Sequence, residues 1–108
     1  MERIYDALIV GGGPAGYAAA LYCVRGGLSV LLLEGAAPGG QLGATADVDN
    51  YPGFEETVAG LELAERMRRG AERFGAVTKL HQVTALDLTS RPKRAETAAG
   101  PFFGRAVI

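Results

Sequence analysis

The fold of this chain is decided by residues 7–16, which read ALIVGGGPAG. The apolar run Ala7–Val10 passes directly into a glycine-rich turn of the form GxGxxG. Residues 17–22 read YAAALY, a composition typical of a helix, and a second apolar run, Val30–Leu33, ends in Glu34. This order predicts a strand, a tight turn, a helix and a parallel strand, which is one βαβ unit.

Each glycine of the GxGxxG pattern has a physical role in binding a dinucleotide. Gly11 permits the tight turn at the end of the strand, and Gly13 lets the backbone approach a pyrophosphate. Gly16 lets the helix lie close to the sheet. Pro14 suits the first turn of a helix that runs to about Arg25 and directs its unpaired amides at the phosphates. The alternative is a glycine-rich turn that binds nothing.

Glu34 narrows the choice of dinucleotide. It follows Gly16 by 18 residues, and the dinucleotide fingerprint expects an acid about 20 residues further on. A carboxylate there can accept hydrogen bonds from ribose hydroxyls and would repel the additional phosphate of NADP. The residues therefore favour FAD or NAD, unless Glu34 is a solvated acid that only ends a strand.

The composition indicates one modest globular domain without a nucleic-acid surface. The chain has 108 residues, of which 48% are hydrophobic and 21% charged, and its formal net charge is −1. The densest group of arginines is interleaved with glutamates, and Glu62 with Arg66 and Glu65 with Arg69 fall at i,i+4. This spacing predicts a solvated helix face rather than a basic binding patch.

The sequence offers little material for catalysis, metal binding or membrane insertion. No signal peptide is visible, and the apolar runs are shorter than the roughly 20 residues of a membrane helix, so we expect a cytoplasmic protein that binds no membrane. Cys23 is the one cysteine and His81 the one histidine. We therefore assign no catalytic residue and no metal ligand.

The remaining pattern predicts further elements around this unit. We expect strands at Ile4–Val10 and Leu28–Leu33, and a long irregular stretch at Gly35–Gly60. A helix is predicted at Leu61–Phe74, closed by Gly75. Its apolar face is expected to comprise Leu61, Ala64, Met67, Ala71 and Phe74.

The last third of the chain predicts a small antiparallel layer. Val77–Thr89 reads as a strand broken near His81, and a turn follows at Ser90–Pro92. Short runs at Lys93–Thr97 and Phe102–Arg105 continue this layer. The apolar Ala106–Ile108 reads as the opening of another buried strand, so we interpret the chain as the N-terminal piece of a longer protein.

Two motifs in the long irregular stretch suggest a family. Residues 38–42 read PGGQL, and residues 48–54 read VDNYPGF. Together with GGGPAG they resemble the low-molecular-weight thioredoxin reductases, which carry GGGPAG, then PGGQL, then VENYPGF. The resemblance implies an α/β, Rossmann-like FAD-binding segment over residues 1–108. Its three layers would include a parallel sheet and a small antiparallel β layer, within an incomplete domain.

The resemblance also implies FAD as the cofactor and assigns residues to it. The turn would lie on the pyrophosphate, Glu34 on the adenosine ribose, and the backbone at residues 82–83 around the adenine. The PGGQL stretch would lie along the isoalloxazine, with the asparagine of VDNYPGF near the ring. The implied cofactor-binding residues are Gly11, Gly13, Pro14, Ala15, Gly16, Glu34, Gly40, Gln41, Thr45, Asn50, Gln82 and Val83.

The chain departs from the family pattern in two ways. The threonine-rich stretch that follows GGQL keeps only Thr45, and Asp49 stands where glutamate is commoner. The family's redox-active CxxC, its NADPH domain and the rest of its FAD domain match no residue here. The resemblance implies that the parent passes electrons from NADPH through FAD to a disulfide, and then to thioredoxin or a similar dithiol protein, as a homodimer. This chain alone would only bind flavin.

Two other readings stay open at this point. One is a related flavoprotein that lacks the CxxC, such as an FAD-dependent ferredoxin–NADP reductase of the thioredoxin-reductase-like type. The other is a stand-alone nucleotide-binding or interaction module whose sheet is completed by a partner chain or by self-association.

Overall fold

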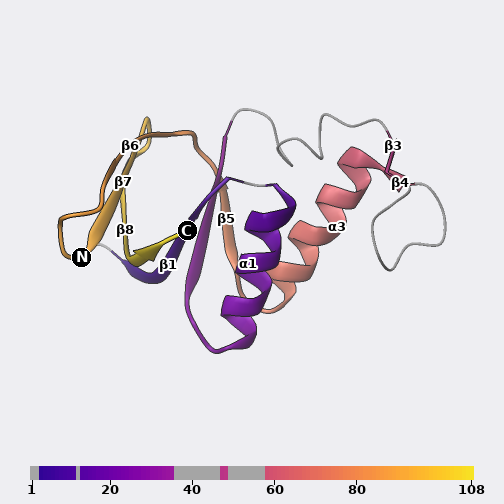
Figure 1. Cartoon of the computed structure of the whole chain (residues 1–108), viewed down its shortest axis with the longest axis horizontal. Coiled ribbons are helices and arrows are strands. Elements are labelled where there is room, and N and C mark those ends of the chain that lie inside the picture. The colour runs from indigo at the N-terminus through magenta and orange to yellow at the C-terminus, as the bar shows by residue number, and fades with distance from the viewer. Residues whose placement is uncertain (1–2, 12, 36–46, 49–57) are drawn as a thin grey trace.

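A computed structural model of the chain describes residues 3–11, 13–35, 47–48 and 58–108. Figure 1 shows the helices packed on one side of a sheet, with the last strands curving away on the other side. The helices are α1 (Pro14–Arg25) and α3 (Gly60–Arg73). The strands are β1 (Ile4–Val10), β2 (Val30–Glu34), β3 (Asp47–Val48), β4 (Val58–Ala59), β5 (Val77–Leu80), β6 (Val83–Asp87), β7 (Lys93–Thr97) and β8 (Gly100–Val107).

Six of these strands form one mixed sheet in the order β5-β2-β1-β8-β7-β6. β2 and β8 both pair parallel with β1, and β5 pairs parallel with β2. β7 pairs antiparallel with both β6 and β8. The predicted parallel sheet with a small antiparallel part is thereby confirmed. β3 and β4 form a separate antiparallel pair.

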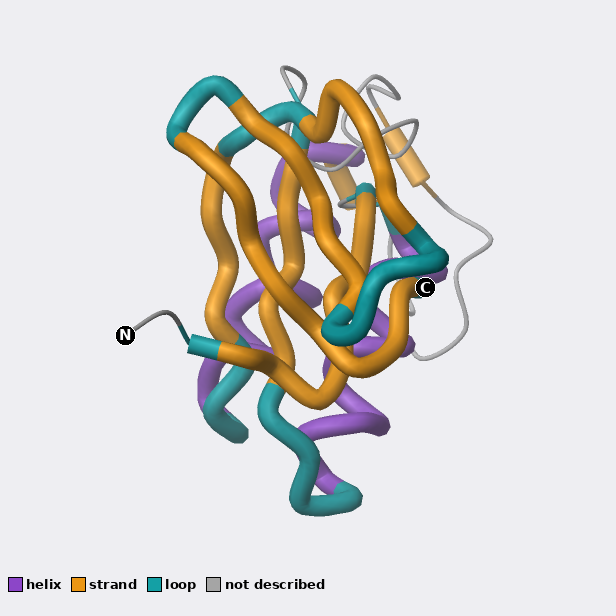
Figure 2. Tube along the Cα trace, turned by 90° about the vertical axis from the view of Figure 1, so that its left-hand side faces the viewer, coloured by secondary structure: helices purple, strands orange, loops and turns teal. Residues whose placement is uncertain are grey.

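Alternate residues of the parallel strands contribute to two different cores. Ala7, Ile9, Val30 and Leu32 pack with residues of α1 and α3 on one face. The residues between them, including Leu8 and Leu31, pack on the other face with Ala95 of β7. Figure 2 shows the layers in depth, with strands at the front and helices behind. Because both faces are covered, Ala7–Val10 of β1 and Val30–Leu33 of β2 read as continuous apolar runs.

One strand joins the two parts of the sheet, and here the sequence-based prediction was wrong. Ala106 and Val107 do not open a new strand, because they continue β8. The first half of β8 pairs with β7, and its second half pairs with β1. Gly104 lies where both pairings meet, and a Cβ there would be 2.5 Å from Leu8 Cγ. No turn residue follows Gly104, so the extended backbone runs on without a break.

The second helix agrees with the prediction apart from its last apolar residue. Met67 and Ala71 pack against the helix-side core as expected, and Leu63 is also fully buried. Phe74 follows the end of the helix and is 55% exposed, so its assignment to the buried face was wrong. Gly75 has φ of +105° and redirects the chain there. The side chains of Leu61 and Ala64 lie outside the described residues.

Other boundaries differ little from those expected. β2 begins at Val30 and not at Leu28, whose side chain is exposed. The predicted break near His81 is confirmed, because it separates β5 from β6. Most of Gly35–Gly60 lies outside the described residues. Neither helix in the described part of the chain has the length and apolar character needed to span a bilayer.

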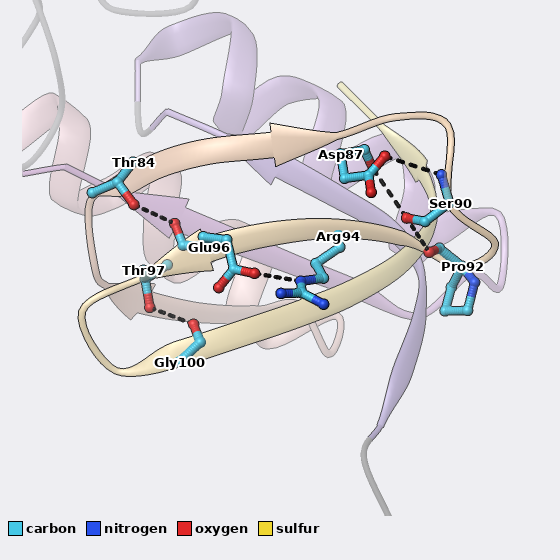
Figure 3. A network of polar contacts seen from close by, with 8 residues as sticks. All are labelled: Thr84, Asp87, Ser90, Pro92, Arg94, Glu96, Thr97 and Gly100. Atoms are coloured by element: carbon cyan, nitrogen blue, oxygen red, sulfur yellow. Dashed lines mark hydrogen bonds and ion pairs between the residues drawn. The ribbon is translucent and has the colours of Figure 1, made fainter.

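Local polar contacts hold the antiparallel strands and their turns (Figure 3). The Thr97 hydroxyl donates to the Gly100 carbonyl at 2.9 Å across the β7–β8 turn. The Asp87 carboxylate accepts from the Ser90 amide at 3.1 Å, and the Ser90 hydroxyl donates to the Pro92 carbonyl at 2.9 Å. Hydrogen bonds from the Thr89 side chain and backbone lower the pKa of Asp87. These contacts close the turns at the two ends of β7.

Asp6 fixes the start of the second strand to the first. Its carboxylate accepts from the Ser29 amide at 2.8 Å and from the Ser29 hydroxyl at 3.1 Å. The Asp6 amide donates in turn to the Ser29 hydroxyl at 2.9 Å. The backbone bond and then the side-chain bond from Ser29 lower the pKa of Asp6 below 3.8, and Arg105 adds a weaker attraction.

This contact predicts a specific acid dependence of stability. The unfolded carboxyl titrates near 3.8 and the folded one lower, so its stabilisation is present above pH 3.8 and is lost as pH falls through the folded pKa. The free energy of unfolding of the wild type should therefore fall towards that of Asp6→Asn as the solution is acidified. Urea unfolding over a series of pH values measures this difference. A difference that stays constant with pH would contradict the assignment.

Candidate functional site

The candidate site lies where the carboxyl ends of three parallel strands meet. β1 runs into Gly11, whose amide donates to the Leu33 carbonyl of β2 at 2.9 Å. Glu34 at the end of β2 is in register with Leu80 at the end of β5. The start of α1 lies at this same edge, the upper one in Figure 1. In open parallel sheets, ligands bind outside the carboxyl ends of the strands.

The turn between β1 and α1 has the geometry that its glycines predict. Gly11 has φ of +108°, a conformation that favours glycine. A Cβ on Gly16 would lie 2.1 Å from the Gly11 carbonyl oxygen, so only a hydrogen atom fits there. A Cβ on Gly13 would meet nothing within 4 Å. The turn is therefore closed on its inner side, while the space beside Gly13 is open.

The first turn of α1 presents backbone donors at this edge. Gly13 is the N-cap in an extended conformation, and Pro14 occupies the first helical position. The first amide with an acceptor inside the helix is that of Tyr17, which donates to the Gly13 carbonyl at 3.1 Å. The amides of Ala15 and Gly16 precede it and have no acceptor within the helix. Such amides, with the positive end of the helix dipole, bind anions such as phosphate.

Glu34 is the acidic group of the site and is almost fully buried. Only 3% of the Glu34 surface is exposed to solvent. Val30 and Leu32 face the helices, and Glu34 shares their face because side chains alternate along a strand. The strand thus carries a carboxylate at its last position, between the sheet and the helix layer.

One arginine of α3, Arg68, is less exposed than the solvated face predicted for these arginines, at 36% of its side chain. The pKa of Arg68 in α3 is raised, first by hydrogen bonding to Glu65 and then by charge attraction from Glu65, Glu72 and Glu34. Glu62 with Arg66 and Glu65 with Arg69 do pair on the outer face, as the spacing predicts. The i,i+3 spacing of Glu65 and Arg68 could have indicated their pairing. No local pattern indicates the attraction between Arg68 and Glu34.

The structure brings one part of the predicted cofactor site together. Gln82 and Val83 follow the end of β5 and so extend from the same edge as the turn and Glu34. Gln82 is exposed, and Val83 packs beside the second core. The other predicted residues, Gly40, Gln41, Thr45 and Asn50, lie outside the described residues.

Comparison with protein families gives a match over most of the chain. The family model described as "Pyridine nucleotide-disulphide oxidoreductase" matches residues 5–99. The chain is 44% identical over 108 residues to a bifunctional thioredoxin reductase/thioredoxin from Mycobacterium leprae, with 99% of this chain and 24% of that protein covered. It is 43% identical to a thioredoxin reductase from Peptoclostridium litorale, with 100% of this chain and 34% of that protein covered.

Solved structures agree with these matches. A thioredoxin reductase from Gloeobacter violaceus superimposes with a TM-score of 0.90 at 42% identity, over 95% of this chain and 33% of that one. A thioredoxin reductase from Giardia duodenalis superimposes with a TM-score of 0.90 at 30% identity, over 98% of this chain and 35% of that one. The chain thus spans about a quarter to a third of the length of these relatives. The resemblance to thioredoxin reductases is confirmed, and the chain belongs to the pyridine nucleotide-disulphide oxidoreductase family.

Proposed function

We propose that this chain is the FAD-binding portion of a thioredoxin-reductase-like flavoprotein. The parent protein would pass electrons from NADPH through FAD to a disulfide substrate such as thioredoxin. The observation that carries this proposal is the convergence of the Gly11–Gly16 turn, the α1 N-terminus and Glu34 at one sheet edge. The names of the relatives support the choice of thioredoxin as the electron acceptor.

The residues at this edge fit the nucleotide half of FAD. The amides of Ala15 and Gly16 suit the oxygens of a pyrophosphate, and the open side of Gly13 leaves room for it. Glu34 ends β2 as an acceptor for ribose hydroxyls. The backbone at Gln82 and Val83 extends from the neighbouring strand end and would frame the adenine.

The flavin half of the site rests on the motifs alone. Gly40 and Gln41 would lie along the isoalloxazine, with Thr45 and Asn50 close by. When bound, FAD supplies the two-electron transfer between a nicotinamide and a disulfide, which side chains alone do not perform. The contribution of this chain is to bind and orient the cofactor, so we assign it no catalytic residue. A homodimer and a cytoplasmic location belong to the same proposal.

The proposal predicts that Gly16→Ala weakens FAD binding about 10- to 100-fold. The new methyl group would lie 2.1 Å from the Gly11 carbonyl oxygen, so the turn must move away from the pyrophosphate. Overpacking of this kind costs about 1–3 kcal/mol, and 1.4 kcal/mol is about tenfold in affinity. Quenching of flavin fluorescence measures the dissociation constant.

Two comparisons separate a local effect from general damage. Gly70→Ala is the matched control, because a Cβ there meets nothing within 4 Å, and it should leave the FAD affinity unchanged. Riboflavin lacks the pyrophosphate and the adenosine, so Gly16→Ala should not alter its affinity. Equal FAD affinity in a folded Gly16→Ala variant would rule out the turn as the pyrophosphate site.

The electron-transfer part of the proposal predicts NADPH-dependent reduction of thioredoxin disulfide. The full natural polypeptide that contains these residues should oxidise NADPH when thioredoxin is added, as followed by NADPH absorbance. The separate 108-residue chain should not, because none of its residues matches the CxxC or the NADPH site of the family. Disulfide reduction by the 108-residue chain would contradict the proposal. So would a full polypeptide whose NADPH oxidation does not increase when thioredoxin is added.

A further inference from the structure

A small pocket opens on the face of the sheet that is turned away from the helices. Its volume is about 220 Å³, and it is lined by Arg3, Tyr5, Lys79, Pro101, Phe102 and Phe103. Tyr5 and Phe102 belong to the second core, on the opposite face of the sheet from α1 and α3. The walls of the pocket therefore come from three separate segments, which are β1 with its N-terminal flank, β5 and β8.

The curved sheet brings β5 close to β8, although β2 and β1 lie between them in the strand order. Phe102 of β8 packs against the same core as Val77 of β5. Lys79 shares the face of Val77, because side chains alternate along a strand. The ammonium nitrogen of Lys79 lies 5.4 Å from the centre of the Phe102 ring. A cation of the edge strand thus reaches an aromatic ring on the far side of β1.

Both cations of the pocket lie over aromatic rings. The guanidinium carbon of Arg3 is 4.5 Å from the centre of the Tyr5 ring, within the range of a cation–π contact. Tyr5 is 6% exposed, so the core holds its ring in place. His81 holds the Phe102 ring in turn, because the two rings stack with their centroids 6.0 Å apart. The rings therefore position both positive charges before any ligand binds.

No acidic side chain forms an ion pair with these two cations within the described part of the chain. The ion pairs found there involve other arginines, namely Arg66, Arg68, Arg69, Arg94 and Arg105. The lining of the pocket includes no aspartate or glutamate among the described residues. Arg3 and Lys79 therefore give the pocket an excess of positive charge. Positive charges gathered in a hollow with apolar walls attract anions more strongly than charges spread over an open surface.

The dimensions of the pocket favour a small ligand over a macromolecule. Pockets for drug-sized ligands have volumes of about 300–1,000 Å³, and this pocket is smaller. A protein partner buries about 800 Å² on each side of a stable interface, which is far more than six lining residues provide. The aromatic walls suit a ligand that carries an apolar group as well as a negative charge.

We propose that this pocket binds a small organic anion, in which a phosphate or carboxylate group is attached to an apolar body. The anionic group would lie between Arg3 and Lys79, and the apolar body would contact the neighbouring aromatic rings. This site goes beyond the proposed FAD function, and the sheet separates it from the candidate nucleotide site. Lys79 lies on the face of the second core, whereas Glu34 shares the helix-facing side with Val30 and Leu32.

The test measures the binding of four probes to the full natural polypeptide with FAD bound, so that the nucleotide site is already filled. Phenyl phosphate and benzoate represent the phosphate and carboxylate sources. Inorganic phosphate lacks the apolar body, and benzylammonium carries the opposite charge. Ligand-observed NMR should give a dissociation constant of about 1 mM or lower for at least one aromatic anion. Inorganic phosphate should bind about fivefold more weakly, and benzylammonium should not bind.

Variants of two lysines separate the pocket from a general effect of charge. Lys79→Met removes a cation of the pocket and should weaken binding of the aromatic anion about tenfold. Lys79→Arg keeps the cation and should retain most of the affinity. Lys93→Met is the matched control, because it loses the same charge but Lys93 lies outside this pocket and donates to the Leu88 carbonyl at 3.1 Å. It should change the affinity by less than about twofold.

The outcomes decide between this pocket and its alternatives. Binding of phenyl phosphate without benzoate assigns the site to phosphate esters, and the reverse assigns it to carboxylates. Equal losses in Lys79→Met and Lys93→Met would overturn the proposal, and so would a flavin-containing polypeptide that binds neither aromatic anion. Tighter binding of a hexaglutamate peptide would also overturn it, because the ligand would then be an acidic protein segment. Flavin absorbance reports FAD binding separately, so failure of the pocket is distinguishable from failure of the proposed function.

Discussion

The pairing of β1 with β2 on one side and β8 on the other is the constraint on which the rest of the structure depends. Because all three strands are parallel, their carboxyl ends meet at one edge. Because the centre of β1 is covered on both faces, Ala7, Leu8 and Ile9 are buried and apolar. The chain can then leave the sheet only through a tight turn, and Gly11 with its positive φ begins that turn. The geometry of the candidate site follows from the burial of this strand.

The same burial places the acid of the candidate site against the helix layer. β2 is buried to its last residue, so Glu34 lies at the margin of the core and not in free solvent. A charged group in that position is tolerated when charges of opposite sign lie close by. Arg68 of α3 hydrogen-bonds to Glu65, and its charge is attracted to Glu34 less strongly than to Glu65 and Glu72. Met67 and Ala71 of α3 pack on the same face of the sheet as Val30 and Leu32 of β2.

The sequence predicted those features that depend on neighbours along the chain. The bounds Ile4–Val10 and Pro14–Arg25 agree with the structure, because an apolar run, a glycine turn and a proline at the helix start are local signals. Phe74 was misplaced because its apolar spacing continued one residue beyond the helix end. The continuity of β8 depends on which strands it pairs with, and pairing between distant segments leaves no local pattern.

The residues of the candidate site also divide into those that have a local sequence signal and those that do not. The turn residues Gly11, Gly13 and Gly16 and the strand-end Glu34 could be chosen from spacing, since the fingerprint fixes their order along one βαβ unit. The attraction between Arg68 and Glu34 could not be predicted, because the two residues lie far apart in the sequence. The roles of Gly40, Gln41, Thr45 and Asn50 stay predictions from the motifs.

The central claim is that the edge formed by the carboxyl ends of the parallel strands is the dinucleotide-binding site of a flavoprotein. A crystal structure of the full natural polypeptide with FAD tests it most directly. The account predicts the pyrophosphate at the amides of Ala15 and Gly16, and the Glu34 carboxylate within hydrogen-bond distance of the adenosine ribose. FAD bound elsewhere, with the Gly11–Gly16 turn free of phosphate, would contradict it.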